Sequence, residues 1–372
     1  MTRPTSGVRD TTDVLVVAEQ LRRPVPGGIG TYIRGLLCGL AALGDDGPAP
    51  TLYASRPTPG PPATDPLAAL GPVVTSPLAA KALVWAWSHG LGRVPDGHGV
   101  VHATSFAVPP TGGVALTVMV HDLAWRHFPE AYPGRGRRWH EAALARTLAR
   151  AALLIVPSSA VADDLLAAGA LPSRVEVVEE GADHLAPPDD NGADALLHRL
   201  GVDGGYLLTV STLEPRKNLA RLIAAYEKAR PALPEPWPLV VVGPHGWGPT
   251  VSVTAGTGAV LAGPAGDGVL SALYRRARLL AYVPLREGFG LPVVEAMACA
   301  TPVVASPVPS AGGAAMEVGP LDVDAMASAL LRVATDDALR ADLVARGRTR
   351  AGALTWERTA RAHAELWSAL GP

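Results

Sequence analysis

Cysteine is scarce in this 372-residue chain, which contains only Cys38 and Cys299. Two cysteines exclude a disulfide-stapled scaffold, and both fall on apolar segments with helical spacing, so we expect two buried, reduced thiols. No cluster of histidine and cysteine has the spacing of a zinc site, and the chain has neither a Walker loop nor a Gly-x-Ser-x-Gly elbow. The sequence therefore gives no sign of a zinc protein, a P-loop nucleotidase or a serine hydrolase.

Charged residues are also few, at 18% of the chain against a usual share of about 25%. The formal net charge is −2, so nucleic acid is not expected as a partner. The N-terminus lacks a continuous apolar segment, and the long uncharged stretch 236–266 is interrupted by glycine and proline, which argues against a signal peptide and a membrane helix. We expect a cytoplasmic protein with at most weak peripheral contact with the inner membrane surface.

Short apolar segments alternate with helical patterns along the whole chain, in which 48% of residues are hydrophobic. Such alternation predicts parallel sheets with helices on both faces. The predicted strands form two series, at residues 14–18, 51–54, 100–103, 115–120, 153–156 and 175–178, and then at residues 206–210, 239–242, 259–262, 280–283 and 302–305.

Two series of strands predict an α/β protein with two doubly wound, Rossmann-like domains. The division falls in the proline- and glycine-rich stretch 186–205. We place an N-terminal domain at residues 1–188 and a C-terminal domain at residues 204–354, with a last helix within residues 355–372.

Two glutamates eight positions apart, Glu287 and Glu295, are the most informative feature of the chain. Glu287 opens a loop containing Gly288 and Gly290, and Glu295 falls in a short helix after Pro292, a residue suited to a first helical turn. Glycine lets a ligand approach the backbone, and a carboxylate accepts two hydroxyl hydrogen bonds, as sugars and riboses require. The plainer alternative is an acidic loop followed by a buried helix.

This segment resembles the E-x7-E signature of family 4 of the retaining glycosyltransferases, which have the GT-B architecture of two Rossmann-like domains facing each other across a cleft. The resemblance implies that Glu287 contacts the donor sugar and Glu295 the ribose hydroxyls of a nucleotide. It also implies that backbone N–H groups at Phe289 and Gly290 hold the sugar, with Leu291 in the same donor-binding segment. In this architecture the last helix crosses back onto the N-terminal domain.

Basic residues follow the first strand of the second series, where Arg216 and Lys217 precede a helical pattern. Arginine offers a planar fork for phosphate oxygens and lysine a point charge. The family has the same pair in this place, which implies that they neutralise the leaving nucleoside diphosphate. Gly243, after the next strand, is expected to shape the nucleotide pocket. The bland alternative for Arg216 and Lys217 is a pair of exposed loop residues.

On the N-terminal side, Gly28 and Gly30 lie between the first strand and the following helical pattern, and His121 ends the fourth strand. Glycines at a helix N-terminus can bind an anion, although a plain strand-to-helix turn explains them as well. The resemblance implies that this loop closes over the donor diphosphate. It also implies that His121, which could otherwise be a structural residue, lines the acceptor side near the anomeric carbon.

Two further groups near His121 have two interpretations each. Trp125, His127 and Phe128 could form an apolar platform for sugars or pack a lid over the next helix. A basic cluster of Arg135, Arg137 and Arg138 is more typical of a solvated helix start, but it could contact a phosphorylated acceptor or an anionic headgroup.

The chain departs from the family pattern in a few places. Glu180 opens a Glu-Gly-Ala-Asp run where many members have Asn-Gly-Val-Asp, and Ala300 replaces a usual glycine at a helix end. Asp322 and Asp324 form an Asp-x-Asp pair, which binds a metal in another glycosyltransferase fold. Here the pair opens a helical pattern, so capping explains it.

We therefore predict a retaining, metal-independent glycosyltransferase without a cofactor. Its donor would be a nucleoside diphosphate sugar, either GDP-mannose or a UDP-hexose, with mannosyltransferase-like members most similar. The acceptor would be a hydroxyl of a glycan, lipid-linked sugar or small metabolite. The alternatives are a non-catalytic nucleotide-sugar-binding protein and another GT-B enzyme, such as a phosphorylase or a nucleotide-sugar epimerase. The sequence does not define the oligomeric state.

Overall fold

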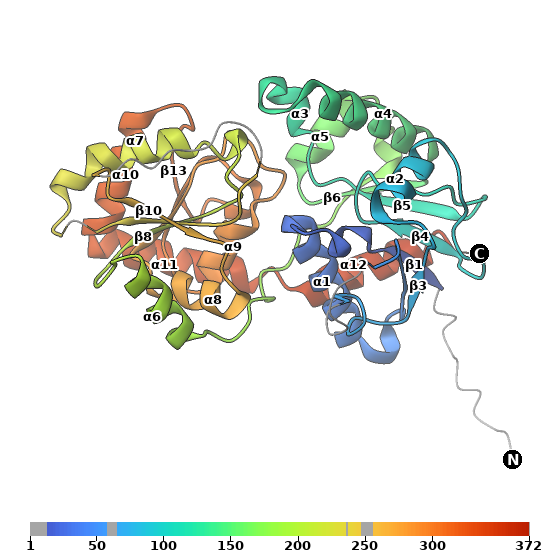
Figure 1. Cartoon of the computed structure of the whole chain (residues 1–372), viewed down its shortest axis with the longest axis horizontal. Coiled ribbons are helices and arrows are strands. Elements are labelled where there is room, and N and C mark those ends of the chain that lie inside the picture. Colours follow the sequence, from blue (N-terminus) through green and yellow to red (C-terminus); the bar gives the residue numbers. More distant parts are fainter. Residues whose placement is uncertain (1–12, 58–64, 236, 247–255, 372) are drawn as a thin grey trace, which may run out of the picture.

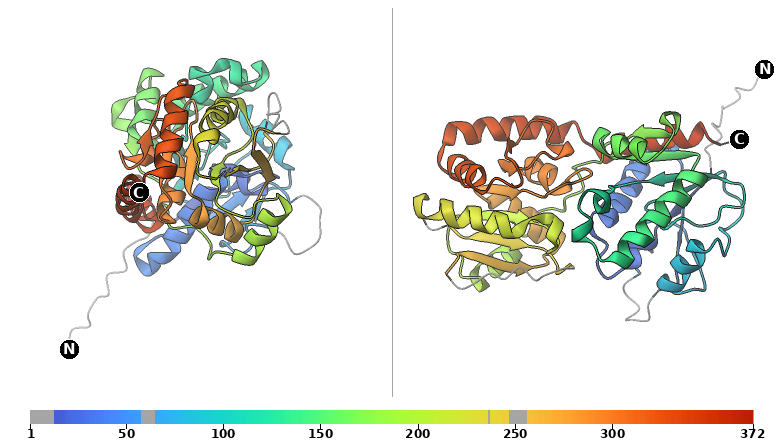
Figure 2. Two further views of the ribbon diagram at one scale, coloured as in Figure 1. Left: turned by 90° about the vertical axis from the view of Figure 1, so that its left-hand side faces the viewer. Right: turned by 90° about the horizontal axis from the view of Figure 1, so that it is seen from above.

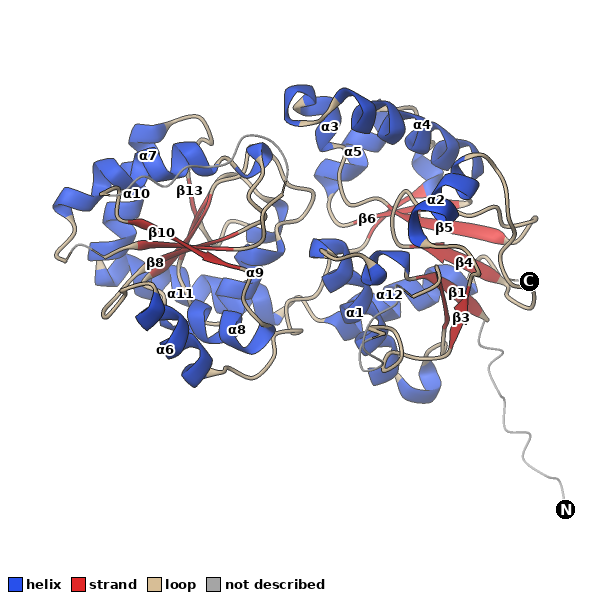
Figure 3. Cartoon of the chain, in the orientation of Figure 1, coloured by secondary structure: helices blue, strands red, loops and turns tan. Residues whose placement is uncertain are grey.

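The structure, a computed structural model, describes residues 13–57, 65–235, 237–246 and 256–371. They form two lobes, each built around one parallel sheet with helices on both sides (Figure 1, Figure 3). The fold is therefore GT-B-like, as the sequence predicts.

The N-terminal lobe contains a sheet in the order β3-β2-β1-β4-β5-β6-β7. All of its strand pairs are parallel, so the carboxyl ends of the strands meet at one edge. Its strands are β1 (Val14–Val17), β2 (Thr51–Ala54), β3 (Val73–Thr75), β4 (Val100–Ala103), β5 (Ala115–Met119), β6 (Leu153–Val156) and β7 (Val175–Val177).

The C-terminal lobe contains a second parallel sheet in the order β10-β9-β8-β11-β12-β13. Its strands are β8 (Leu207–Val210), β9 (Leu239–Val242), β10 (Ala259–Gly263), β11 (Leu279–Tyr282), β12 (Val303–Ala305) and β13 (Met316–Glu317).

Strands β3 and β13 are the two that the sequence did not predict. Both are short and lie at a sheet edge, and Val74, Thr75 and Glu317 are exposed. An edge strand of two or three residues needs no continuous apolar pattern, because one side of it has no neighbouring strand.

The helices between the strands pack their apolar residues against the sheets. The N-terminal lobe contains α1 (Gly27–Ala42), α2 (Ala80–Ser88), α3 (Ala124–His127), α4 (Gly134–Arg150) and α5 (Ser159–Ala167). The C-terminal lobe contains α6 (Asp190–Arg199), α7 (Leu219–Ala229), α8 (Asp267–Arg276), α9 (Leu291–Ala298), α10 (Val323–Thr335) and α11 (Asp337–Gly352).

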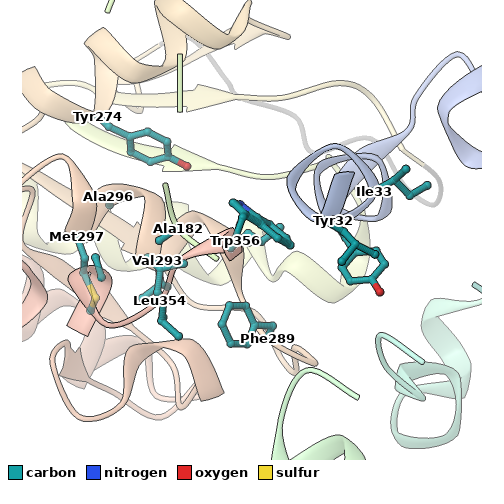
Figure 4. Close-up of a cluster of buried hydrophobic side chains, with 14 of the residues drawn as sticks. Tyr32, Ile33, Ala182, Tyr274, Phe289, Val293, Ala296, Met297, Leu354 and Trp356 are labelled. Carbon is teal, nitrogen blue, oxygen red and sulfur yellow. The ribbon is translucent and has the colours of Figure 1, made fainter. Parts of the chain in front are cut away.

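The last helix, α12 (Trp356–Ser368), leaves the C-terminal lobe and packs on α1 of the N-terminal lobe (Figure 2). Its first residue, Trp356, lies among side chains from both lobes, between Tyr32 on one side and Val293 on the other (Figure 4). Gly35 of α1 and Gly181 have no room for a side chain, because a Cβ at either position would collide with Trp356. Glycine therefore permits the close crossing of α12 over the N-terminal lobe.

The cysteines do not match the expectation of two buried thiols. Cys38 is exposed and Cys299 is half-buried. Helix α1 buries Ile33, Leu36 and Leu37, and Cys38 falls on the face that points away from them. No helix among the described residues is both long and apolar enough to span a membrane.

Candidate active site

A cleft of about 500 Å³ opens between the two lobes, at the carboxyl ends of both sheets. Ligands of open α/β sheets bind at these ends. All of the predicted site residues except Gly30 line the cleft, which brings together His121 from the N-terminal lobe and Arg216, Lys217, Glu287 and Glu295 from the C-terminal lobe.

Arg216 and Lys217 meet at Glu287. They lie in a short 3-10 turn after β8, and both donate to Oε1 of Glu287, over 2.9 Å from Arg216 Nη1 and 2.6 Å from Lys217 Nζ. Lys217 also donates to the Tyr282 hydroxyl over 3.0 Å. Arg216 is paired with Glu214 as well, at 3.0 Å.

The charge of Glu287 is fixed by these neighbours. Burial alone would raise its pKa, but the positive charges of Arg216 and Lys217 outweigh burial and lower the pKa to about 2. Glu287 is therefore ionised throughout the neutral range, and Arg216 remains a cation because its carboxylate neighbours outweigh burial and raise its pKa. Arg216, Lys217 and Glu287 therefore form a buried, charged cluster at the carboxyl ends of the strands of the second sheet.

Glu295 lies in α9, and both of its carboxylate oxygens have partners. Nε2 of His184 lies 3.0 Å from Oε1, and the Tyr274 hydroxyl donates to Oε2 over 2.7 Å. Burial lowers the pKa of His184, but the hydrogen bond to Glu295 and the charge of Glu295 outweigh it, and the net shift is upward. Trp356 Nε1 lies 3.1 Å from the other ring nitrogen of His184. His184, which lies between β7 and α6 where the chain passes from one lobe to the other, thus orients Glu295.

His121 follows β5 and lines the cleft together with the charged cluster of Arg216, Lys217 and Glu287. Its Nε2 lies 3.1 Å from the Thr104 carbonyl oxygen, and its Nδ1 lies 3.3 Å from Oε1 of Glu180. A carbonyl oxygen only accepts hydrogen bonds, so Nε2 carries a proton. The ring also packs edge-on to Tyr32, with 5.1 Å between centroids.

The loop before α9 makes the contact between the lobes. The Ser158 hydroxyl donates to the Gly288 carbonyl over 2.6 Å, and a Cβ at Gly288 would collide with the His121 carbonyl. The sequence suggested that Gly288 lets a ligand approach, but the N-terminal lobe fills that space instead. Gly290, at φ 101° before the first residue of α9, has the left-handed conformation that favours glycine.

The other predicted glycines differ in their surroundings. Gly28 lines the cleft, whereas Gly30 is buried in the first turn of α1, where a Cβ would collide with Pro26. Both lie inside α1 rather than in a loop before it. Gly243 lines the cleft with φ 145°, and a Cβ there would collide with the Ser211 carbonyl at the end of β8.

Aromatic side chains form the N-terminal wall of the cleft. Trp125 and His140 are stacked, with 4.6 Å between centroids, and Phe106 packs edge-on to Trp125 at 5.5 Å. Of the three candidates from the sequence, Trp125 lines the cleft, whereas His127 and Phe128 do not.

The basic cluster and the Asp-x-Asp pair lie outside the cleft. Arg135, Arg137 and Arg138 are exposed in the first turns of α4. Asp322 caps α10 by accepting from the Ala325 N–H, and Asp324 pairs with Lys228. Within the part of the chain that the structure describes, no group of three or more His, Cys, Asp or Glu is placed to hold a metal ion.

Two residues of the cleft, Tyr282 and Glu180, and two that hold Glu295 from outside it, Tyr274 and His184, were not predicted as site residues from the sequence. Tyr274 and Tyr282 belong to apolar segments that looked like ordinary core, and their hydroxyl partners are distant in sequence. His184 had one signal, because it directly follows the Glu-Gly-Ala-Asp run. Glu180, noted only as a departure, proves to be the carboxylate partner of His121.

Comparisons with known proteins agree with this geometry. The family model described as "Glycosyltransferase Family 4" matches residues 26–184, and that described as "Glycosyl transferases group 1" matches residues 204–350. An O-antigen chain mannosyltransferase B of Escherichia coli is 31% identical over 69% of this chain and 71% of its own length. The chain belongs to the group 1, family 4 glycosyltransferases, and it transfers sugar from a nucleotide-sugar donor to an acceptor.

Other similar proteins include a D-inositol 3-phosphate glycosyltransferase of Salinispora arenicola, 36% identical over 61% of this chain and 58% of its own length. Among solved structures, a sucrose-phosphate synthase from Thermosynechococcus elongatus superposes with a TM-score of 0.71 at 22% identity, covering 96% of this chain and 99% of that chain. Anabaena HepE in complex with UDP and glucose superposes with a TM-score of 0.68 at 18% identity, covering 96% and 100%. These two structures show that the fold is GT-B.

Proposed function

We propose that this enzyme transfers a hexose from a nucleoside diphosphate sugar with retention of anomeric configuration and without a metal ion. The observation that carries the proposal is the meeting of Arg216 and Lys217 at Glu287, across the cleft from His121. We assign donor binding to residues 204–354 and acceptor binding to residues 1–188, with the helix in 355–372 joined to the acceptor side.

Arg216 and Lys217 are proposed to stabilise the leaving nucleoside diphosphate. Charge grows on the leaving oxygen in the transition state, and fixed cations in a partly dry cleft stabilise it strongly. Both side chains line the cleft and keep part of their surface exposed there, 11% for Arg216 and 13% for Lys217, so N–H groups can reach a phosphate oxygen. These two cations would take the place that a divalent ion has in other transferases.

The remaining donor contacts are proposed for residues around α9. Glu287, with Phe289, Gly290 and Leu291, would hold the sugar, and Glu295 would hold the ribose hydroxyls. Similarity to a mannosyltransferase favours GDP-mannose as the donor. The UDP bound in Anabaena HepE makes a UDP-hexose the second candidate donor.

Acceptor activation is proposed to involve little more than positioning. His121 would lie near the anomeric carbon, and the acceptor hydroxyl would attack on the face that the diphosphate leaves, which gives retention. We place the reaction in the cytoplasm, with acceptors that extend from a glycan or a lipid-linked sugar at the inner membrane surface to a small metabolite.

Slow hydrolysis of several donors without acceptor tests the function directly. We expect one of GDP-mannose, UDP-glucose or UDP-galactose to be hydrolysed, with equal rates in EDTA and in added Mg²⁺. Loss of activity in EDTA that Mg²⁺ restores would contradict metal independence, and no turnover of any nucleotide sugar would contradict the function. The configuration of the transferred sugar, read by NMR coupling constants, decides between retention and inversion.

Arg216→Ala should lower turnover by about 10²–10³-fold, because the negative charge on the leaving diphosphate grows in the transition state. Arg275→Ala is the matched control, since Arg275 of α8 forms an exposed ion pair with Asp190 of α6 and such pairs contribute little. Equal turnover in both variants, measured per folded molecule, would remove Arg216 from the leaving-group site.

A further inference from the structure

We propose that the acceptor unit entering the cleft is an uncharged pyranose, not a phosphorylated sugar or inositol. The inference rests on the proposed function, which it deepens by naming the acceptor class. The acceptor class is an open question because the similar proteins differ in it by name. One is an O-antigen chain mannosyltransferase, and another is a D-inositol 3-phosphate glycosyltransferase.

The first support is the aromatic wall of the N-terminal lobe. Phe106, Tyr132 and His140 are half-buried at the cleft, and Trp125 lies behind His140 with its ring stacked 4.6 Å away. Tyr132 and His140 pack edge-on, with 6.1 Å between centroids. Aromatic walls with a few fixed polar groups are typical of pockets for small neutral ligands, and the C–H face of a pyranose fits against such rings.

The second support is the sign of the charge on this side of the cleft. The charged groups that the N-terminal lobe contributes are Asp122 and Glu180. Ionised carboxylates accept hydrogen bonds from sugar hydroxyls, and they repel a phosphate in a cleft of low polarity. Asp122 holds the Ala124 N–H with Oδ1, and its Oδ2 lies 3.8 Å from Nη1 of Arg216. That distance is longer than a hydrogen bond, so Oδ2 can still accept from a sugar hydroxyl.

The third support is that the cations of the cleft are already in use. Arg216 and Lys217 are the only lysine or arginine among its described lining residues, and both belong to the donor side. Arg216 lies within 4 Å of Asp122, Glu214 and Glu287. When the donor diphosphate is bound there, no lysine or arginine among the described lining residues remains for a second phosphate.

Basic residues next to the cleft are also engaged or turned outward. Arg126 makes two hydrogen bonds to Glu141, and Arg286 pairs with Asp164 at 2.7 Å. Arg135, Arg137 and Arg138 are exposed and do not line the cleft. Among the described residues, a phosphate on the acceptor would have to leave the cleft to find a free cation, either at this exposed cluster or at Arg34 in the adjoining pocket.

The test uses the full chain with the donor that is hydrolysed most rapidly. Methyl α-D-manno-, gluco- and galactopyranoside are compared with the corresponding hexose 6-phosphates and with inositol 3-phosphate. We expect kcat/KM for the best neutral glycoside to exceed that for every phosphorylated acceptor by at least about 100-fold. Asp122→Asn should narrow this ratio, because it removes a negative charge while the new side-chain amide oxygen can still accept from the Ala124 N–H.

Variants of the aromatic wall test the site itself. Phe106→Ala should raise the KM for the methyl glycoside at least about tenfold and change donor hydrolysis much less, whereas Phe106→Leu, which keeps apolar volume, should lie between. Trp85→Ala is the control, since Trp85 is 58% exposed and lies outside the cleft.

The outcomes separate the inference from the function. Preference for a phosphorylated acceptor, or a rise in KM for it in an Arg135→Ala/Arg137→Ala/Arg138→Ala variant, would overturn the inference and leave the function standing. If the enzyme hydrolyses the donor but no neutral glycoside accepts the sugar or changes the rate of hydrolysis, the inference is overturned and the function again stands. Absence of any donor turnover would overturn both.

Discussion

Ala300 adopts a conformation that alanine rarely takes. Its φ is 58°, in the left-handed region, directly after Cys299, the C-cap of α9. A side chain costs roughly 1–2 kcal/mol there because Cβ approaches the following carbonyl oxygen, and glycine pays no such cost. The sequence departure at this position is therefore a strained helix end.

We expect Ala300→Gly to raise the free energy of unfolding by about 0.5–1 kcal/mol, since relief of strain exceeds the entropy that glycine adds to the unfolded chain. Ala298→Gly, at the exposed last residue of α9 with an ordinary helical backbone, should lower it by at most about 0.5–1 kcal/mol. Urea unfolding of both variants measures the difference. Destabilisation by both would mean that Ala300 is held without strain.

Glu295 is the residue on which nucleotide affinity is expected to depend most. Both oxygens are held in place by His184 and Tyr274, so the carboxylate is oriented before the ribose arrives, and little entropy is lost on binding. We therefore propose His184 as a positioning residue for Glu295.

Glu295→Gln should weaken binding of free GDP or UDP by about 10- to 100-fold, the value of a lost charged hydrogen bond of roughly 1.5–3 kcal/mol. Calorimetry on the folded variant measures this, with Glu317→Gln at an exposed edge strand as the control. Unchanged affinity in Glu295→Gln would place Glu295 outside the nucleotide site.

At the scale of elements, a buried chain of hydrogen bonds ties α12 to the N-terminal lobe. His363 Nδ1 donates to the Thr359 carbonyl, so its Nε2 accepts from the Tyr32 hydroxyl at 2.8 Å. Tyr32 in turn accepts from His102 Nε2 at 2.9 Å. His102 Nδ1 accepts from Thr117, which receives the Trp367 N–H.

Each hydrogen-bond donor in this series of contacts has an acceptor, provided that His102 and His363 are both neutral. Burial lowers the pKa of His363 to about 4 and also lowers that of His102. A proton added to either ring would place two donors opposite each other in a dry environment. Helix α12 is therefore held most firmly when both rings are uncharged.

Stability should consequently fall with acid. The unfolded histidine has a pKa near 6.5 and binds a proton that the folded one excludes, so its contribution is complete above about pH 6.5 and lost as pH falls towards 4, about 3 kcal/mol for one group. His363→Gln should show a shallower loss over this range than the parent chain. His198→Gln, at an exposed site on α6, should keep the parental slope. An unchanged slope in His363→Gln would mean that His363 does not control acid stability.

At the scale of the whole molecule, the lobes touch through the loop that carries Glu287. Ser158 binds Gly288, Arg286 pairs with Asp164 at 2.7 Å, and Arg216 lies 3.8 Å from Asp122. If donor and acceptor bind to different lobes, as proposed, this contact would set the distance between their reacting groups.

Gly288→Ala should disturb transfer far more than nucleotide binding. Its Cβ would collide with the His121 carbonyl, and the resulting displacement of the lobes should reduce transfer by about 100-fold, while nucleotide contacts proposed within the C-terminal lobe remain. Gly266→Ala is the control, because it has open space and a negative φ. If transfer in Gly288→Ala equals that of the control, the lobe contact does not govern the reaction.

The sequence by itself determined the two parallel sheets and the family, because these depend on local properties. Strands such as β1 and β9 are continuous apolar segments, and the loop from Glu287 to Pro292 combines spacing and glycine chemistry that few folds use. Short edge strands and the exposure of Cys38 were not readable, since they depend on which face meets the rest of the molecule.

Tertiary structure alone decided how the cleft is assembled. Glu295 meets His184 and Tyr274, and His121 meets Glu180, through contacts between residues 21 to 111 positions apart. The close packing of Gly288 against the His121 carbonyl is likewise a contact between residues far apart in the sequence. Such pairs leave no periodic trace in the chain, because a hydrogen bond or a close backbone contact constrains positions in space and not their spacing in sequence.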